Sequence, residues 1–407
     1  MGAPLFAIIA AGALIGFQRV GVDSMIVPME IYRVSEIPVL IAIPLFTFAG
    51  YLLGESRAPR RLVRVTNALL GWMPGGLAVV ALAVCALFTA FTGASGVTII
   101  AMGALLYPAL AEAGYREQFN LGLITTSGSL GLLFAPSLPL ILYGIVAEQP
   151  VDDLFLAGIL PGTLMLVLLS AWSIREGRRL QVAQTRPRFD RREAAAALRA
   201  AIWELPLPVL VLGGIYSGFF AVSEAAAVTV IYVLVVEVVI YREISLRRLP
   251  EVMRESMLLV GGILIILGAS LASTNFMIDA QVPEKLFGLV TAHISSKLGF
   301  LVLLNLFLLA LGMMLDIFSA LVIVVPLILP IAAGFGIDPI HLGMIFLANM
   351  QIGYCTPPVG MNLFIASFRF EKPIMLLYRS ALPFLAILLV AVLIITYWPW
   401  LSLVLVR

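Results

Sequence analysis

The sequence predicts an all-α, polytopic membrane protein whose two halves repeat one pattern of spans in opposite orientations. Three observations predict this class. The 407 residues are 62% hydrophobic and only 12% charged, with a mean hydropathy of +1.09, whereas a soluble domain carries about 25% charged residues. Arginines gather between long apolar runs, and prolines and glycines recur at one fixed separation. A chain this poor in charge needs lipid as its solvent.

Basic clusters orient the spans, because Lys and Arg in short loops mark the cytoplasmic side of a membrane. Four clusters lie within residues 57–64, 175–199, 242–254 and 369–379, and we place all four inside. The acidic connector 148–153 contains no Lys or Arg, so we place it outside. The two cysteines and two histidines are far apart, which argues against a disulfide framework or a helical metal pair. No nucleic-acid signature is present.

The apolar runs predict the spans in order. We interpret Met1–Phe17 as a retained first span and not as a removed signal, because it shows neither a charged leading region nor a cleavage pattern. Further full spans are expected near 37–54, 119–147, 154–174, 206–221, 224–240, 254–273, 340–367 and 380–402.

Two further pairs of apolar segments, 76–92 with 95–111 and 299–315 with 317–333, have shorter arms. Arms of about 16 residues fall short of the ~20 that a full crossing needs. Sidedness alone would allow either two crossings or a re-entrant hairpin for each pair. The glycines and hydroxyls at the first junction favour hairpins, because irregular backbone at membrane depth survives only where it is buried or lines a cavity.

The positions of several prolines and glycines repeat at one fixed offset in the numbering. Four pairs of proline or glycine share an offset of 222: Pro108 and Pro330, Gly131 and Gly353, Pro136 and Pro358, and Pro161 and Pro383. The span 37–54 is matched by 254–273, yet the two cross in opposite directions. Inverted repeats of this kind are typical of secondary transporters, whose site lies at the repeat interface near the middle of the bilayer.

The first half contains two irregular stretches within apolar sequence. Phe91–Thr98 holds two glycines and several hydroxyls, and Thr125–Pro139 holds hydroxyls, glycines and two prolines. Helix breaks here would free carbonyl and hydroxyl oxygens that suit a small cation such as sodium, while half-helix N-termini suit carboxylates. A flexible kink is the alternative interpretation.

The second half repeats this arrangement. Asp316 is the sole acid in the apolar stretch 298–337, and an ionisable residue within a membrane is a functional-site hypothesis by default. The alternative is an aspartate that caps the following helix, and both roles could coexist. Downstream, Pro357 and Pro358 remove two backbone donors and must break a helix, for which a purely structural kink is again the alternative.

At these residues the sequence resembles the large membrane subunit of TRAP transporters, the tripartite ATP-independent periplasmic systems. The resemblance covers essentially the whole chain. Its most specific runs are Asp338-Pro339-Ile340-His341 and Thr356-Pro357-Pro358-Val359-Gly360. Further matching stretches are Ile43–Phe46, Thr92–Thr98, Gly131–Pro139, Met314–Asp316, Pro326–Pro330 and Leu342-Gly343.

The resemblance implies an elevator-type fold, in which a mobile transport domain of two hairpins and two broken helices slides within a scaffold. The transport domain would comprise 76–150 and 298–368. The scaffold and connecting helices would comprise 1–75, 151–297 with a cytoplasmic loop at 175–200, and a C-terminal helix within 369–407.

The resemblance also implies site residues. A first sodium site maps to Thr92, Gly93, Ser95, Gly131, Ala135 and Pro136. A second sodium site maps to Asp316, Ser319, Gly353, Thr356 and Pro357. The substrate is expected near Ser95, Thr98, Ser137, Asp316, Asn349, Thr356 and Asn362. No arginine lies deep in a span, so we expect a carboxylate to meet helix ends, hydroxyls and amides.

The sequence departs from the family pattern at three places. Ala94 stands where paired serines are usual, Val97-Thr98 replaces Ala-Thr, and Ala135-Pro136 replaces Pro-Pro. Ligation by backbone oxygens tolerates these changes. A hydroxyl at position 94, however, cannot bind substrate in this chain.

The function implied is sodium-driven import of an organic acid, such as a C4-dicarboxylate or a sialic acid, in a bacterial inner membrane. The implied partners are a small four-helix membrane subunit and a periplasmic substrate-binding protein, with sodium as coupling ion, no other cofactor and no ATP. A stand-alone elevator carrier of the dicarboxylate or citrate type is the alternative. An intramembrane enzyme is disfavoured, because one buried acid and two histidines at segment edges make no catalytic pair.

Overall fold

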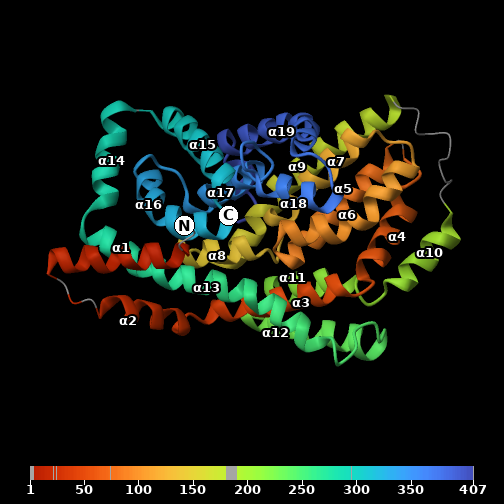
Figure 1. Cartoon of the computed structure of the whole chain (residues 1–407), viewed down its shortest axis with the longest axis horizontal. Coiled ribbons are helices and arrows are strands. Elements are labelled where there is room, and N and C mark those ends of the chain that lie inside the picture. Colours follow the sequence, from red (N-terminus) through yellow and green to blue (C-terminus); the bar gives the residue numbers. More distant parts are fainter. Residues whose placement is uncertain are drawn as a thin grey trace.

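The computed structural model describes residues 4–21, 23, 25–73, 75–179, 190–294 and 296–406. Every regular element among these residues is helical (Figure 1). Eight helices are long and apolar enough to cross a membrane, or nine if the bent pair Glu117–Leu133 and Leu138–Val146 counts as one span. The predicted class of all-α, multi-span membrane protein is therefore confirmed.

One set of helices, the peripheral group, lies along the lower edge of Figure 1. It comprises α1 (Leu5–Val20), α2 (Ile26–Arg33), the 3-10 turns η1 (Val34–Glu36) and η2 (Pro38–Ile41), α3 (Ala42–Glu55), α11 (Pro206–Tyr216), α12 (Val222–Leu234) with the π-helical turn η5 (Val235–Ile240), and α13 (Leu249–Asp279). The 31-residue helix α13 packs against α1, α2 and α3 and so holds the group together.

The second set, the central group, packs above the first. Its first half is α5 (Gly76–Thr92), α6 (Ser95–Glu112), α7 (Glu117–Ser127), η3 (Leu130–Leu133), α8 (Leu138–Val146) and α9 (Val151–Arg179). Its second half is α15 (Lys297–Met314), α16 (Ile317–Gly334), α17 (Pro339–Gly353), α18 (Met361–Phe370), α19 (Ile374–Tyr397) and α20 (Trp400–Leu403). The two groups meet where α3 contacts α5 and where α13 contacts α16.

Both halves of the central group show the same order of a helical hairpin followed by a broken helix. The hairpin α5–α6 turns at Gly93, and α15–α16 turns at Leu315, the equivalent position at the repeat offset. The helices break again before Pro136 and Pro358, where both peptide bonds are cis. Figure 1 places the first hairpin in the right half of the molecule and the second in the left half, so they approach the centre from opposite ends.

Glycines at equivalent positions let each break pack against its own hairpin. A Cβ atom on Gly131 would lie 2.4 Å from the amide nitrogen of Ala90, and one on Gly353 would lie 2.5 Å from the Cα of Gly312. Ala90 and Gly312 are related by the same repeat offset. Small residues allow backbones to approach this closely, which favours helix association in lipid.

The two breaks also touch each other. The hydroxyl of Ser129 donates to the backbone carbonyl of Gln351 at 3.4 Å, and these two residues are themselves separated by 222 positions. Because these two residues are equivalent in the repeat, the symmetry axis that relates the two halves passes close to their contact. The breaks therefore lie at the centre of the repeat.

Four helices were not anticipated from the apolar runs: α2, α4 (Ala58–Leu70), α10 (Arg191–Ala200) and α14 (Val282–His293). Each lies between predicted spans. The helices α9 and α19 pack with the central group, on α5, α7 and α17, although the sequence assigned their residues to the scaffold. Part of the expected loop 175–200, including Arg186 and Arg188, lies outside the described residues.

Arg61 of α4 ties together three carboxylates near the ends of the peripheral helices. Its Nη1 lies 2.5 Å from Glu243, its Nη2 lies 3.3 Å from Glu237, and its Nε bonds Glu204. The guanidinium also lies 4.0 Å from the centroid of the Tyr241 ring. Burial opposes the charge of Arg61, but its hydrogen bond with Glu243 and the attraction of Glu204 outweigh burial and raise its pKa.

We predict that Arg61→Ala destabilises the fold, because the buried carboxylates of Glu204 and Glu237 lose their cation. Removing one partner from a buried ion pair costs about 3–5 kcal/mol. Unfolding in detergent micelles, followed by circular dichroism, measures the change. The matched control is Arg64→Ala on the same helix, because Arg64 pairs with Glu193 in a half-exposed position and should leave the unfolding midpoint unchanged. Equal effects of the two variants would contradict the prediction.

We also predict that Gly353→Ala lowers stability, because its new methyl group would meet backbone atoms of Gly312 that cannot turn aside. Overpacking of this kind costs about 1–3 kcal/mol. Gly262→Ala in α13 is the control, since nothing lies within 4 Å of its Cβ position. Thermal unfolding in detergent should show a lower midpoint for the first variant and no loss for the second. A neutral Gly353→Ala would mean that the break and the hairpin are not in close contact.

Candidate functional site

The two hairpin tips meet at one cavity of about 330 Å³, called here the tip cavity. Tip 1 is Gly93–Val97 and tip 2 is Asp316–Phe318. The peripheral group contributes Tyr51 of α3 and Leu259 of α13 to the wall. The remaining lining residues are Leu132, Tyr354, Met361 and Ile365. The volume lies in the range of small-molecule sites, about 300–1,000 Å³.

Tip 1 contains the start of α6, which has no side-chain cap among the described residues. The helix α5 ends where Gly93 takes a φ of +64°, and Ala94 then runs extended into α6. In the described part of the chain, no side chain caps α6 at Ala94. Because the first amides of a helix have no partner within it, the N–H groups of the first turn of α6 are open to an anionic group in the cavity.

Tip 2 differs, because its first amides already have acceptors. A carboxylate oxygen of Asp316 accepts from the amides of Phe318 and Ser319 at 3.0 Å each. The Ser319 hydroxyl donates to the other carboxylate oxygen, and the amide of Ile317 donates to the Tyr354 hydroxyl. Asp316 therefore caps α16, which is the alternative role considered from the sequence, while it also lines the cavity.

Ser95 joins the hairpin of the first half to the broken helix of the second. Its hydroxyl donates to the side-chain oxygen of Asn362 at 2.8 Å. The Asn362 amide in turn donates to the carbonyl of Thr125 at 3.3 Å. Ser95 and Asn362, both predicted substrate residues, are thus in contact across the repeat interface. Asn362 is fully buried and lies behind the tip, so Ser95 is the one of the pair that lines the cavity.

The first predicted sodium site is partly assembled around tip 1 and the break after η3. Gly93 packs so closely on Leu138 that a Cβ atom would lie 2.4 Å from it. Next to these two residues are Thr92 and Ser137, whose hydroxyls are fully buried and have no hydrogen-bond partner among the described residues. A buried hydroxyl without a partner costs free energy, so this position suits an oxygen-coordinated cation.

The residues of the second predicted sodium site fall into two contacting sets, one at tip 2 and one at the break after α17. Gly353 contacts Gly312 at the end of the first arm of the second hairpin, just before tip 2. The hydroxyl of Thr356 donates to the carbonyl of Ile352 at 2.8 Å within its own helix. Thr356 and Pro357 follow Gly353 at the break, while Ser319 is engaged by Asp316. A cation here would rely on backbone carbonyls more than on free hydroxyls.

Five predicted substrate residues lie outside the lining of the tip cavity: Asn362 and Thr356, described above, and Thr98, Asn349 and Ser137. Thr98 is buried and its hydroxyl is 2.7 Å from that of Thr89 within the first hairpin. Asn349 is buried on α17 and donates to Asn305 at 2.7 Å. Ser137 begins α8 behind tip 1. These side chains support the walls of the cavity and do not face it.

The predicted site residues do not include the cavity wall that the peripheral group supplies. Tyr51 and Leu259 lie in runs that look like ordinary spans, and only the packing of the two groups brings them to the tips. The predicted site residues also omit Gln351, whose side-chain amide is fully buried, with no hydrogen bond to its nitrogen or oxygen among the described residues. A lone glutamine in an apolar span was a usable signal for that residue.

The charges of the tip cavity limit what it can bind. The described residues that line it include one carboxyl group, that of Asp316, and no Lys, Arg or His. The described residues hold no group of three or more His, Cys, Asp or Glu side chains that could bind a metal. An anionic ligand would therefore face a carboxylate without a basic side chain to offset it, unless cations or helix N-termini supply the positive charge.

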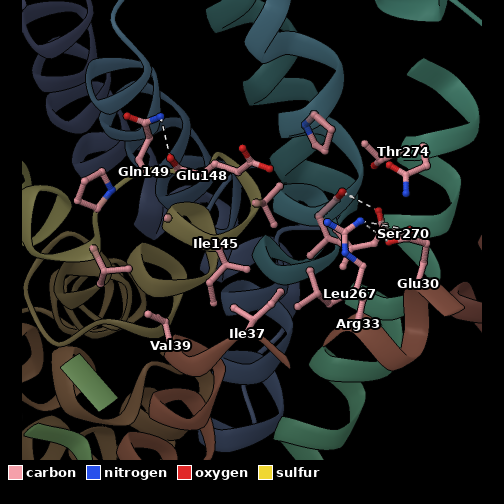
Figure 2. A pocket seen from close by; sticks show the side chains of 18 of the residues that line it. Glu30, Arg33, Ile37, Val39, Ile145, Glu148, Gln149, Leu267, Ser270 and Thr274 are labelled. Carbon is pink, nitrogen blue, oxygen red and sulfur yellow. Dashed lines mark hydrogen bonds and ion pairs between the residues drawn. The ribbon is translucent and has the colours of Figure 1, made fainter. Parts of the chain in front are cut away.

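A larger second cavity of about 670 Å³ lies between the same two groups of helices. Figure 2 shows its wall, where Ile37 and Leu267 lie near Ile145 and where Arg33 lies beside Glu30. Nη1 of Arg33 is 3.3 Å from the carboxylate of Glu30. None of the predicted sodium or substrate residues lines this cavity.

Residues 1–401 match the family model described as the tripartite ATP-independent periplasmic transporter, DctM component. A C4-dicarboxylate TRAP transporter large permease protein DctM of Pseudomonas aeruginosa is 37% identical over 377 residues, which are 93% of this chain and 88% of that protein. An isethionate TRAP transporter permease protein DctMQ of Oleidesulfovibrio alaskensis is 33% identical over 398 residues, which are 98% of this chain and 61% of that protein.

A solved structure of the YdaH transporter of Alcanivorax borkumensis, described as having an unusual topology, resembles this fold. Its TM-score is 0.61 at 15% identity, covering 92% of this chain and 87% of that one. At this identity the likeness concerns the fold alone. The matches over nearly the full length confirm the family that the hairpin tips and proline breaks predicted: the chain belongs to the DctM family, the large permease component of TRAP transporters.

Proposed function

We propose that this chain is the transport subunit of a TRAP system that imports an organic acid together with sodium ions. The observation that carries the proposal is the tip cavity, where both hairpin tips and both halves of the repeat meet. Its size suits a small organic acid. The relatives that name C4-dicarboxylates and isethionate as substrates share this chain's family, and both substrates are small anions. Sialic acid and similar carboxylates belong to the same class.

Within the cavity, the carboxylate of the substrate binds the open N–H groups of the first turn of α6. Tip 1 is favoured over tip 2 because Asp316 and Tyr354 already occupy the first amides of α16. Sodium is required because Asp316 would otherwise repel the substrate and no basic side chain lines the cavity. One sodium ion sits near Thr92 and Ser137, and the other sits near Asp316 and the break at Gly353–Pro357.

The subunit works as an elevator in a bacterial inner membrane. The basic loops face the cytoplasm, so the first hairpin re-enters from the cytoplasm and the second from the outside. Tyr51 lies one turn before Glu55, whose carboxylate pairs with Arg248 of a basic loop. The tip cavity thus borders the cytoplasmic halves of the peripheral helices, and this conformation faces inward. The central group then moves against the peripheral group to face outward.

Two protein partners complete the system: a small four-helix membrane subunit and a periplasmic substrate-binding protein. Support for the first comes from the DctMQ relative, whose name joins a second component to DctM and which this chain covers to only 61%. The binding protein delivers the substrate and selects it. No ATP is consumed. Uptake that does not depend on these partners would instead indicate a stand-alone carrier.

We predict that uptake requires sodium, the binding protein and Asp316. The assay is uptake into proteoliposomes that hold this chain with its small subunit, with and without an inward sodium gradient. Asn caps helices about as well as Asp, so Asp316→Asn keeps the cap on α16 but removes the charge. We expect its sodium-driven uptake to fall about tenfold or more, equivalent to ~1.4 kcal/mol of lost interaction. Asp316→Ala should lose uptake and also stability, by about 1 kcal/mol.

The control is Asp190→Asn, because Asp190 caps the exposed helix α10 far from the tips. Its uptake should equal that of the wild type. Sodium-independent uptake by the wild type would remove both ion sites, and uptake without the binding protein would favour the stand-alone carrier. If the Asp316→Asn variant showed the same sodium dependence of uptake as the wild type, Asp316 would have only a capping role.

We also predict that Thr92→Val and Ser137→Ala weaken sodium coupling without unfolding the protein. Each removes a buried hydroxyl that has no hydrogen-bond partner among the described residues. The sodium concentration for half-maximal uptake should therefore rise, by about 5-fold for a lost contact of ~1 kcal/mol. Thr229→Val is the matched control, since the buried hydroxyl of Thr229 already donates to Ala225. Unchanged sodium dependence in both test variants would place the cation elsewhere.

A further inference from the structure

Two residues of the tip cavity are equivalent in the repeat but differ in chemistry. Tyr354 follows α17 at the second break, and Leu132 lies in η3 at the first break. Their positions differ by the repeat offset of 222, and both residues line the tip cavity. The second half of the chain therefore brings a phenol to the cavity where the first half brings an aliphatic side chain.

The helices that start at the two tips are equivalent in the same way. Ser95 is the first residue of α6 and Ile317 is the first residue of α16, again 222 positions apart. Among the described residues, no side chain caps the start of α6. The amide of Ile317, by contrast, donates to the Tyr354 hydroxyl at 2.5 Å. Tip 1 leaves its first helix amide open, and tip 2 covers the equivalent amide with a phenol oxygen.

The Tyr354 hydroxyl has a donor capacity that the fold does not use. A tyrosine hydroxyl can accept and donate hydrogen bonds at the same time. It accepts from Ile317, and in the described part of the chain no residue accepts its proton. The hydroxyl lies at tip 2, which borders the cavity, so this proton is available to an acceptor there. Accepting one hydrogen bond also polarises the O–H group and strengthens the bond that it donates.

The position of Tyr354 is fixed by its surroundings. The residue is only 4% exposed. Its amide donates to the carbonyl of Met350, and its own carbonyl accepts from the amide of Asn362, each at 3.0 Å. A donor that is held in place before the ligand arrives loses little conformational entropy on binding.

Neighbouring groups at tip 2 do not offer an alternative donor. The amides of Phe318 and Ser319 already donate to Asp316, and the Ser319 hydroxyl does so as well. An ionised aspartate can only accept hydrogen bonds. Among the described residues of tip 2 and its break, the open donor toward the cavity is therefore the hydroxyl of Tyr354.

We propose that the Tyr354 hydroxyl donates a hydrogen bond to a second oxygen of the ligand, at the end opposite to the carboxylate that binds tip 1. The inference rests on the proposed function and deepens it, because it names the ligand class: an organic acid with an oxygen acceptor at each end. The start of α6 acts on the ligand directly, whereas the start of α16 acts through Tyr354. The two tips thus offer one donor each from equivalent positions.

Three four-carbon probes test this inference on the purified complex of this chain with its small subunit. Succinate has a carboxylate at each end, 4-hydroxybutyrate has a carboxylate and a hydroxyl, and butyrate has one carboxylate. The rise of the unfolding midpoint with probe concentration, measured in sodium buffer, gives each Kd. The wild type should bind succinate, 4-hydroxybutyrate or both about tenfold more tightly than butyrate, equivalent to ~1.4 kcal/mol. The preferred probe shows whether the second acceptor is charged or neutral.

In Tyr354→Phe this preference should fall to nearly equal binding of the probes, because the ring stays and the O–H donor is lost. A merely structural role of the hydroxyl would weaken all three probes by the same factor and leave their ratio unchanged. The matched control is Tyr143→Phe. Tyr143 is fully buried away from the tip cavity and its hydroxyl donates to the carbonyl of Pro339, so this variant should keep the wild-type ratio.

Two results would overturn the inference. The first is equal binding of all three probes by the wild type, which is decisive even if Tyr354→Phe does not fold. The second is a full wild-type preference in Tyr354→Phe. Failure of the proposed function is distinct, because the wild-type complex would then bind none of the probes in a sodium-dependent manner.

Discussion

Backbone groups that leave a helix at membrane depth must find partners inside the protein, and the architecture follows from that requirement. Both hairpins turn and both central helices break within apolar sequence. Each break is buried against its own hairpin through glycine, at Gly131 and at Gly353. The two breaks then bury each other through Ser129 and Gln351. The peripheral helices cover the remaining open side of the tips, and the space left between them is the tip cavity.

The two halves of the repeat share a backbone plan but differ in chemistry. Tip 2 satisfies its own helix start with Asp316 and Tyr354, whereas tip 1 has Ala94 where a capping side chain would be. The first amides of α16 at tip 2 therefore have acceptors within the protein, whereas α6 at tip 1 has no side-chain cap among the described residues. A symmetric framework that contains an asymmetric site can bind one ligand in one orientation. The departure from the family's paired serines at position 94 is consistent with recognition by backbone amides, which do not depend on that side chain.

A cluster of charged side chains around Arg61 lies outside the tip cavity, whose one described charged residue is Asp316. Arg61 binds Glu204, Glu237 and Glu243 at one end of the peripheral group. These contacts hold α4, the start of α11 and the end of α12 to one another.

The sequence by itself determined the fold class, the repeat and the family. The apolar composition indicated a chain that needs lipid as its solvent, and the fixed repeat offset located equivalent breaks at Pro136 and Pro358. The motifs at the tips indicated the DctM family. Each of these signals can be seen in the sequence because it is a local property of the chain. Tertiary structure alone decided which predicted residues line the tip cavity. Thr98 and Asn349 form hydrogen bonds with residues of neighbouring helices instead, and Tyr51 and Leu259 reach the tips from spans with no motif. The capping of α16 by Asp316 was a stated alternative, but its geometry needed the folded turn. Side-chain direction and the meeting of distant helices depend on packing between segments, and that packing has no counterpart in local sequence.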